Sequence, residues 1–165
     1  MVRYFVVMGV SGCGKSTVAA ALARAWDLAY VEGDDLHGAA NVAKMASGMP
    51  LTDADRWPWL DRIGAALAGE FGGAVASCSA LRRAYRDRLR HAVADRLGFI
   101  MIDLDRSALE QRMLSRSRHY MPVSLLDSQL RTLERPEGEP DTLILDGSLP
   151  VDAMVALASR WRDSI

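Results

Sequence analysis

The residues whose types and spacing most directly predict chemistry are Gly9–Ser16, which read GVSGCGKS. They match G-x-x-x-x-G-K-[ST] in full, between an apolar run and an alanine-rich helical stretch, as the motif requires. Glycines let such a loop curl so that successive N–H groups face phosphate oxygens beside a helix N-terminus. We expect Lys15 to reach the β- and γ-phosphates of a nucleotide and the Ser16 hydroxyl to ligate Mg²⁺. The predicted phosphate-binding residues are Gly9, Val10, Ser11, Gly12, Cys13, Gly14, Lys15, Ser16 and Thr17.

A second polar group lies in VEGDDLHGAANVAKM, residues 31–45, where an apolar run ends. Ligands of an open parallel sheet gather outside the carboxyl ends of its strands, so this segment should lie near the glycine loop. Asp34 is placed to hydrogen-bond an acceptor hydroxyl and take its proton. Glu32, two residues earlier and on the same side of the strand, is a candidate for holding Mg²⁺ through water. Asp35 is interpreted as a solvated turn residue, and His37 alone is compatible with capping or packing.

Arginines form the third group. The segment SCSALRRAYRDRLR, residues 77–90, places hydroxyl and guanidinium groups near the same edge, namely Ser79, Arg82, Arg83, Arg86 and Arg90. Guanidinium groups match carboxylate geometry, so the set predicts a pocket for a small polyhydroxylated anion. The alternative is a charged helix face, which we favour for Arg82 and Arg88. Farther along, Arg112 and Arg116 are four residues apart and share one face of a predicted helix.

These groups require elements that bring them together. Five short apolar runs read as buried parallel strands, at Tyr4–Met8, Ala29–Val31, Ala74–Cys78, Phe99–Leu104 and Thr142–Leu145. Helical patterns separate them, and alternating strands and helices predict an α/β domain with helices on both faces of the sheet. Pro58 is placed to open a helix whose apolar face runs from Trp59 to Phe71. A capping box at Ser107–Glu110 predicts a helix through Arg116. Segments 36–57 and 116–140 read as excursions from the sheet.

Composition narrows the function classes. The chain has 165 residues, which suits one domain, and a formal net charge of -1, which does not suggest a nucleic-acid binder. No apolar run is long enough for a membrane segment. With no signal peptide visible, the two cysteines, Cys13 and Cys78, are read as reduced thiols of a cytoplasmic protein.

Four segments together resemble the gluconokinase family, and the resemblance extends from about Tyr4 to Leu157. They are MGVSGCGKSTV, EGDDLHGAANVAKMASGMPLTDADRWPWL, CSALRRAYRDRLR and EQRMLSRSRHYMPVSLLDSQLRTLERP. The resemblance implies a three-layer α/β/α P-loop NTPase fold with a five-stranded parallel sheet, related to shikimate kinase and adenylate kinase. It implies one kinase domain over residues 1–165, with an acceptor-binding segment at 36–60 and a lid region at 112–140. The chain departs from the family at Gly38, where proline is usual, and at Glu32, where many relatives carry aspartate.

The resemblance also implies an activity: ATP-dependent phosphorylation of D-gluconate at its 6-hydroxyl, with ATP and Mg²⁺ as cofactors, by a homodimer. Carried over by position, the gluconate-binding residues are Asp34, His37, Lys44, Arg56, Ser79 and Arg83. The catalytic residues are Lys15, Asp34 and Arg116, and the lid contacts ATP through Arg112 and Arg116, with Arg118 and His119 as weaker candidates. Trp57 and Trp59 are expected to pack beside the pocket.

Two other functions stay open on the sequence. One is a kinase for another small acceptor, such as shikimate or a nucleoside monophosphate. Arg56 with Asp34 and His37 favours a sugar acid over a nucleotide, since no base-stacking pattern is evident. The other is a nucleotide-binding regulatory switch, which needs a partner surface and a water-positioning group that the sequence does not identify.

Overall fold

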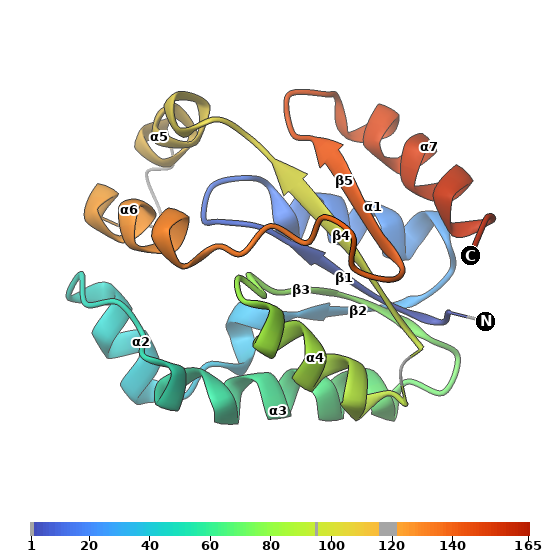
Figure 1. The fold of residues 1–165 in the computed structure, drawn as a ribbon, viewed down its shortest axis with the longest axis horizontal. Coiled ribbons are helices and arrows are strands. Elements are labelled where there is room, and N and C mark those ends of the chain that lie inside the picture. Colours follow the sequence, from blue (N-terminus) through green and yellow to red (C-terminus); the bar gives the residue numbers. More distant parts are fainter. Residues whose placement is uncertain (1, 95, 116–121) are drawn as a thin grey trace.

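In the computed structural model, which describes residues 2–94, 96–115 and 122–165, the chain folds around a five-stranded sheet. The strand order is β2-β3-β1-β4-β5 and every pairing is parallel (Figure 1). The bounds are β1 Tyr4–Met8, β2 Ala29–Glu32, β3 Ala74–Ser77, β4 Leu97–Asp103 and β5 Thr142–Asp146. The predicted α/β class and the five strands are confirmed, and no strand end differs from its predicted position by more than two residues. Strands β2 and β3 lie on one side of β1, and β4 and β5 lie on the other. The loop after β1 is therefore at the topological switch point, where such sheets bind ligands.

Helices cover both faces of the sheet, as predicted (Figure 1). One layer holds α1 and α7, and the other holds α3 and α4. At the carboxyl edge lie α2, α5, α6 and the 3₁₀ turn η1, away from both termini. The bounds are α1 Lys15–Ala25, η1 Gly33–Leu36, α2 Ala39–Ala46, α3 Asp53–Gly69, α4 Arg83–Ala92, α5 Arg106–Ser115, α6 Val123–Thr132 and α7 Val151–Arg162.

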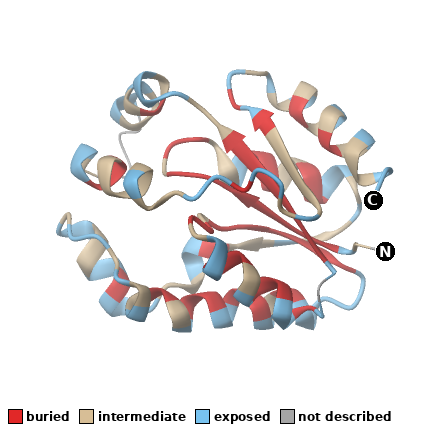
Figure 2. Ribbon diagram, in the orientation of Figure 1, coloured by how far each residue is buried: buried red, intermediate tan, exposed pale blue. Residues whose placement is uncertain are grey.

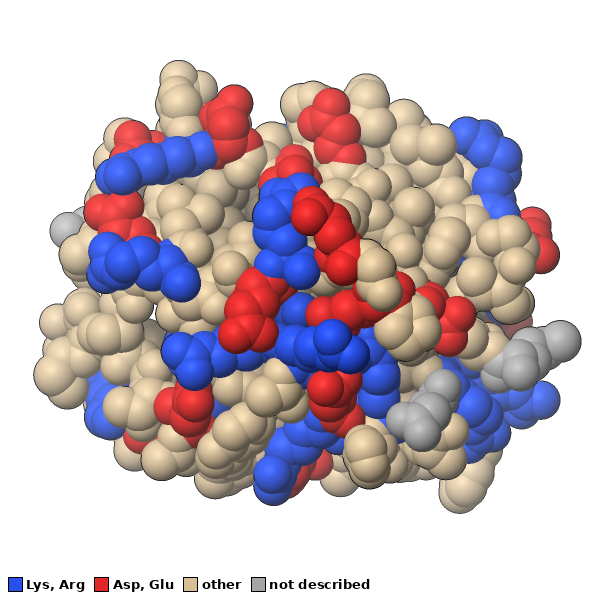
Figure 3. All heavy atoms as spheres, in the orientation of Figure 1, with Lys and Arg blue, Asp and Glu red and all other residues tan. Residues whose placement is uncertain are grey.

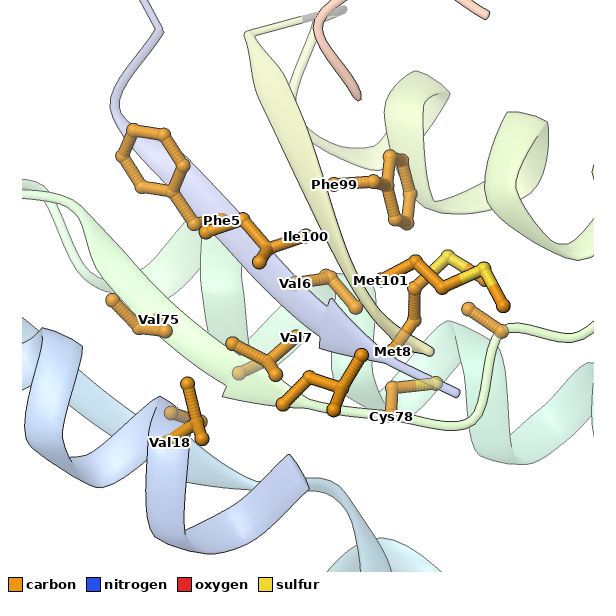
Figure 4. Packing of buried hydrophobic residues seen from close by; sticks show 14 of the residues in the cluster. Phe5, Val6, Val7, Met8, Val18, Val75, Cys78, Phe99, Ile100 and Met101 are labelled. Carbon is orange, nitrogen blue, oxygen red and sulfur yellow. The ribbon is translucent and has the colours of Figure 1, made fainter. Parts of the chain in front are cut away.

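The core surrounds β1, all five of whose residues are buried (Figure 2). Its side chains alternate between the two layers, so that Val6 and Met8 lie with Phe99 and Met101 on one side (Figure 4). On the other side Phe5 contacts Trp26 and Trp161, with ring centroids 4.7 and 6.2 Å apart. A strand buried on both faces explains the continuous apolar run in the sequence and fixes the start of the glycine loop.

The start of α3 differs from the prediction. The helix begins at Asp53 rather than at Pro58, which lies inside it. Thr52 and Asp55 form a complete capping box, with the Asp55 N–H donating to Thr52 Oγ1 and the Thr52 N–H to Asp55 Oδ2. This cap stabilises a start one and a half turns before the proline. The expected apolar Phe71 is 89 % exposed, because α3 ends at Gly69.

The start of α5 also differs. Ser107 and Glu110 do not form the predicted capping box, since Ser107 already lies within the helix. Asp105 performs the capping instead, accepting a hydrogen bond from the Ala108 N–H at 2.8 Å. Glu110 accepts a hydrogen bond from Arg106 at 2.9 Å. The helix is described through Ser115, so the predicted end at Arg116 lies outside the described residues.

Charged residues of both signs interleave on the face shown in Figure 3, where no broad area of one sign is seen. In the interior, Glu139 accepts hydrogen bonds from Arg86 and Arg90, and the Arg86 side chain is fully buried. Cys13 and Cys78 are both buried and free of disulfides. Across the described ranges, no helix combines the length and apolarity needed to cross a membrane.

Candidate active site

The glycine loop joins β1 to α1 at the centre of the carboxyl edge. Gly12 and Gly14 have φ of +86° and +97°, values that side-chain-bearing residues rarely adopt. Gly14 is the N-cap of α1, and no described side chain caps that helix end. The first N–H groups of α1 therefore lack the usual side-chain oxygen, which is the arrangement that an anion completes. The structure thus fits a bound phosphate group at the predicted position.

Polar contacts within the loop are already organised. Lys15 Nζ donates to the Val10 carbonyl at 3.1 Å, so the ammonium is folded over the loop. The Ser11 N–H donates to Gln129 Oε1 of α6 at 2.7 Å. The Gly9 N–H donates to the Ser79 carbonyl at 3.3 Å, which places the β3–α4 connection beside the loop. Gln129 was missed on the sequence because its partner is 118 residues away.

Glu32 ends β2 beside the first turn of α1. Its carboxylate accepts hydrogen bonds from Ser77 Oγ at 2.6 Å and the Tyr30 hydroxyl at 2.5 Å. Although partial burial acts to raise it, these bonds and the nearby Ser16 hydroxyl lower the pKa of Glu32. An ionised carboxylate next to the Ser16 hydroxyl suits a divalent cation held through water. In the part of the chain that the structure describes, no three His, Cys, Asp or Glu residues form a metal cluster of their own.

A cavity of about 400 Å³ connects the loop to the segment after β2. Its polar lining includes predicted residues from both halves of the site, namely Ser11, Lys15, Asp34, His37, Arg56 and Ser79. Apolar side chains from α2, α3 and α6 complete the wall, among them Val42, Met45, Trp59 and Leu125. Asp34 and Lys15 therefore share one cavity, although they belong to different strand–helix connections. Phosphoryl transfer to a small acceptor requires both groups in one site, and this cavity provides it.

Arg56 is held in the cavity by a chain of side chains. The residue is only 8 % exposed, and its guanidinium donates from Nη1 to the Tyr85 hydroxyl at 3.0 Å. The Tyr85 hydroxyl in turn hydrogen-bonds Asp53, which also pairs with Arg82 at 3.2 Å. Burial and the Asp53 carboxylate raise the pKa of Tyr85, which keeps its hydroxyl protonated. Arg56 is thus oriented by a neutral hydroxyl group, and a guanidinium in this position suits an anionic ligand.

His37 is fixed on two sides. Its ring stacks on Trp59, with centroids 4.0 Å apart and 15° between the planes. The Trp59 indole N–H donates to the Gly33 carbonyl at 2.7 Å, which anchors the stack to η1. Asn41 Nδ2 lies 3.2 Å from His37 Nδ1. Burial, together with the charges of Arg62 and Arg56, lowers the pKa of His37 to about 4.

The structure does not bring every predicted residue into the cavity. Lys44 pairs with Asp55 at 2.7 Å and ties α2 to the start of α3. Arg83 is exposed and lies 3.7 Å from Asp87, on the outer side of α4. Neither side chain is among those that line the cavity.

Arg86 and Arg90 occupy another position than the one expected. Both guanidinium groups bind Glu139, at 2.6 and 2.9 Å. Arg86 also donates to the Ala80 carbonyl at 2.8 Å, one residue beyond Ser79. Arg86 therefore holds the connection that carries Ser79 rather than lining the cavity.

Of the predicted lid arginines, Arg112 can be placed. It donates to the Cys13 carbonyl at 3.1 Å and to the Gly147 carbonyl at 2.9 Å, so it links α5 to the glycine loop and to the β5–α7 connection. This position beside the glycine loop is compatible with its predicted role. Arg116, Arg118 and His119 lie outside the described residues.

The parallel sheet, the glycine loop at its switch point and an acceptor cavity beside Lys15 define a P-loop phosphotransferase. A protein-family model described as an AAA domain matches residues 5–136. A gluconokinase from Gluconobacter oxydans (strain 621H) is 46 % identical over 156 residues, which cover 93 % of this chain and 87 % of that protein. The chain belongs to the gluconokinase family.

Solved structures agree with this assignment. A gluconokinase from Sinorhizobium meliloti 1021 superposes with a TM-score of 0.89 at 47 % identity, covering 96 % of this chain and 90 % of that one. A shikimate kinase from Aquifex aeolicus superposes with a TM-score of 0.66 at 14 % identity, covering 97 % and 96 % of the two chains. The second likeness shows the shared fold alone, which the family resemblance implied.

Proposed function

We propose that this protein is a gluconokinase, which transfers the γ-phosphoryl group of ATP to the 6-hydroxyl of D-gluconate and forms 6-phospho-D-gluconate and ADP. The observation that carries the proposal is one cavity that holds Lys15 of the glycine loop together with Asp34 and Arg56. The names of its relatives at 46 and 47 % identity support the same acceptor. Arg56 suits the carboxylate end of a sugar acid, and Lys15 and Asp34 of the same cavity would then act on its far hydroxyl.

Roles follow from the position of each group. Lys15 and the loop amides hold the phosphates and stabilise charge on the transferring group. Asp34 hydrogen-bonds the 6-hydroxyl and accepts its proton as the new O–P bond forms. His37, Arg56 and Ser79 orient the acceptor. Arg112 borders the nucleotide, and Arg116 remains the sequence-based candidate for neutralising the phosphoryl group.

The proposed cofactors are ATP and Mg²⁺. Ser16 and Glu32 are the residues that fit the metal, the hydroxyl directly and the carboxylate through water. Held by these two residues, Mg²⁺ would offset the negative charge of the nucleotide phosphates during transfer. Following the family resemblance, we also propose that the enzyme acts as a cytoplasmic homodimer, which light scattering and cell fractionation would test.

The test is ADP production by the purified protein with Mg-ATP, with and without D-gluconate. We expect strong acceleration by gluconate and little by shikimate or nucleoside monophosphates. Equal ADP production with and without gluconate would contradict the proposal and favour a slow nucleotide switch. Acceleration by a different acceptor would keep the kinase and change its substrate.

Variants assign the roles. Asp34→Ala should lower kcat by about 10²–10⁴-fold, the range for a lost general base, while ATP binding is retained. An exposed carboxylate outside the cavity provides a control, and Glu70→Ala should change kcat by less than about threefold. Lys15→Ala should weaken nucleotide binding as well as turnover. Unchanged turnover in Asp34→Ala would remove that residue from the mechanism.

A further inference from the structure

Asn41 of α2 is one of the few buried polar side chains, at 7 % exposure. Its Nδ2 atom makes two contacts, to the backbone carbonyl of Asp55 at 3.0 Å and to His37 Nδ1 at 3.2 Å. The first contact joins α2 to α3, and the second reaches the cavity wall. No role in binding was assigned to Asn41 from the sequence.

The Asp55 contact determines which way the Asn41 amide faces. A backbone carbonyl oxygen can only accept a hydrogen bond, so the amide must present its NH₂ group on that side. The same NH₂ group faces His37 Nδ1, and an amide NH₂ can only donate. Nδ1 must therefore be the accepting nitrogen of the imidazole. In a neutral ring the proton is then on Nε2.

The surroundings of His37 favour that neutral ring. Its pKa is lowered to about 4 by burial and by the charges of Arg62 and Arg56 on α3. The acidic groups of η1 that share the cavity are Asp34 and Asp35. From α2, the ammonium of Lys44 is paired with Asp55. The stack on Trp59 fixes the ring plane, so an Nε2–H group has one direction available to it.

We propose that Asn41 is a positioning residue, which holds His37 as the neutral Nε2–H tautomer so that this N–H donates to a hydroxyl group of the acceptor. The proposal rests on the function proposed above, because it takes the cavity as the acceptor site. It makes His37 a hydrogen-bond donor rather than a base or a cation. An acceptor that lacks the matching hydroxyl leaves the His37 Nε2–H group without a hydrogen-bond partner. Asn41 and His37 together therefore favour polyhydroxylated acceptors.

The tautomer can be measured without any substrate. Nitrogen-15 NMR of the full-length protein near pH 7 distinguishes a protonated from an unprotonated ring nitrogen, and the His37 signals are assigned by their loss in His37→Gln. We expect Nε2 protonated and Nδ1 unprotonated. Asn41→Asp should reverse this, since a carboxylate beside Nδ1 requires a proton there and raises the pKa of the ring. Ala43→Asp adds the same charge on an exposed position of α2 and should leave the tautomer unchanged.

Kinetics test the consequence for the acceptor. A glutamine side chain can place an N–H near the position of Nε2, whereas asparagine is too short. His37→Gln should therefore keep the KM for gluconate within about threefold, while His37→Asn and His37→Ala raise it about tenfold, the effect of one lost hydrogen bond. The KM for ATP should not change in any of them. In Asn41→Asp the KM for gluconate should become pH-dependent between about pH 6 and 8, unlike the wild type.

The outcomes separate the two proposals. A wild-type protein without gluconate-dependent turnover would overturn the proposed function, while the NMR result would still decide the tautomer. A charged or Nδ1-protonated His37 in the wild type would overturn the role of Asn41, even in an active gluconokinase. Equal losses in His37→Gln and His37→Ala would show that the N–H donor is not used. Circular dichroism of Asn41→Asp checks its fold, and the His37 series gives the answer if that variant unfolds.

Discussion

Glutamine in place of Glu139 would remove one charge from the protein interior and keep the shape of the side chain. The carboxylate is 5 % exposed and accepts from Arg86 Nε at 3.0 Å, Arg86 Nη2 at 2.6 Å and Arg90 Nη2 at 2.9 Å. Arg86 is fully buried, so without this carboxylate its charge has no counter-ion in contact among the described residues. We expect Glu139→Gln to be one of the most destabilising single-atom changes in the chain.

The magnitude follows from these contacts. Breaking a buried ion pair by removing one partner costs about 3–5 kcal/mol. Arg86 keeps hydrogen bonds to the carbonyls of Ala80, Leu81 and Glu134, and glutamine still offers one oxygen, so the lower end applies. A loss of about 3 kcal/mol corresponds to a fall in Tm of about 6–12 °C for a protein of this size.

Urea and thermal unfolding followed by circular dichroism would measure the loss. Glu137→Gln is the matched control, because Glu137 pairs with Arg135 on the surface, where the two side chains are 65 % and 41 % exposed. That pair should contribute no more than about 1 kcal/mol. If Glu139→Gln is as stable as Glu137→Gln, the buried Arg86 guanidinium does not need the Glu139 carboxylate as its counter-ion.

The same pair predicts a pH dependence. Although burial acts to raise it, hydrogen bonds from Arg86 and Arg90 hold the pKa of Glu139 below its ordinary value. A carboxyl group with a depressed folded-state pKa stabilises the protein above its unfolded-state pKa, and this contribution is lost as the pH falls through the folded-state value. The stability difference between wild type and Glu139→Gln should therefore be full near pH 7 and shrink below about pH 4.

Two glycines near the acceptor cavity should respond in opposite ways. An added Cβ at Gly33 would lie 2.0 Å from the Ser77 carbonyl oxygen, so Gly33→Ala must displace η1, and both Tm and gluconate turnover should fall. Gly38 has φ of -70° and follows His37 with ψ of 137°, both of which proline accepts, so Gly38→Pro should raise stability by about 0.4–1 kcal/mol without loss of activity. Arg112→Ala should raise the KM for ATP with little change in that for gluconate, and a fluorescent-nucleotide titration would check it; an unchanged ATP affinity would argue against the lid role.

The phosphate half of the site could be predicted almost completely, because its motif specifies a backbone conformation between adjacent elements. Positive φ at Gly12 and Gly14 is what the spacing of glycines requires. Sequence also predicted which strand ends meet, since Lys15, Asp34 and Ser79 each follow a parallel strand. Parallel topology alone brings those three positions to one edge.

The errors arose where a side chain found its partner far along the chain. Arg86 was expected at the acceptor edge, and it is instead neutralised by Glu139, 53 residues later. No local sequence pattern predicts that ion pair. The start of α3 differs for another reason: the capping box of Thr52 and Asp55 begins the helix, and Pro58 still lies near enough to the N-terminus to be accommodated.

The two halves of the cavity are held by different means, and this predicts how each tolerates change. The phosphate half is held by backbone conformation and by main-chain hydrogen bonds, such as that from Gly9 to the Ser79 carbonyl. The acceptor half is held by side chains that brace one another, as Tyr85 braces Arg56 and Asn41 braces His37. The backbone conformation of the loop can bind the phosphates of any nucleoside triphosphate. In the acceptor half, each ligand-binding side chain can be substituted together with the side chain that positions it. A change of acceptor within this fold therefore requires paired substitutions in α2, α3 and α4, with the glycine loop left as it is.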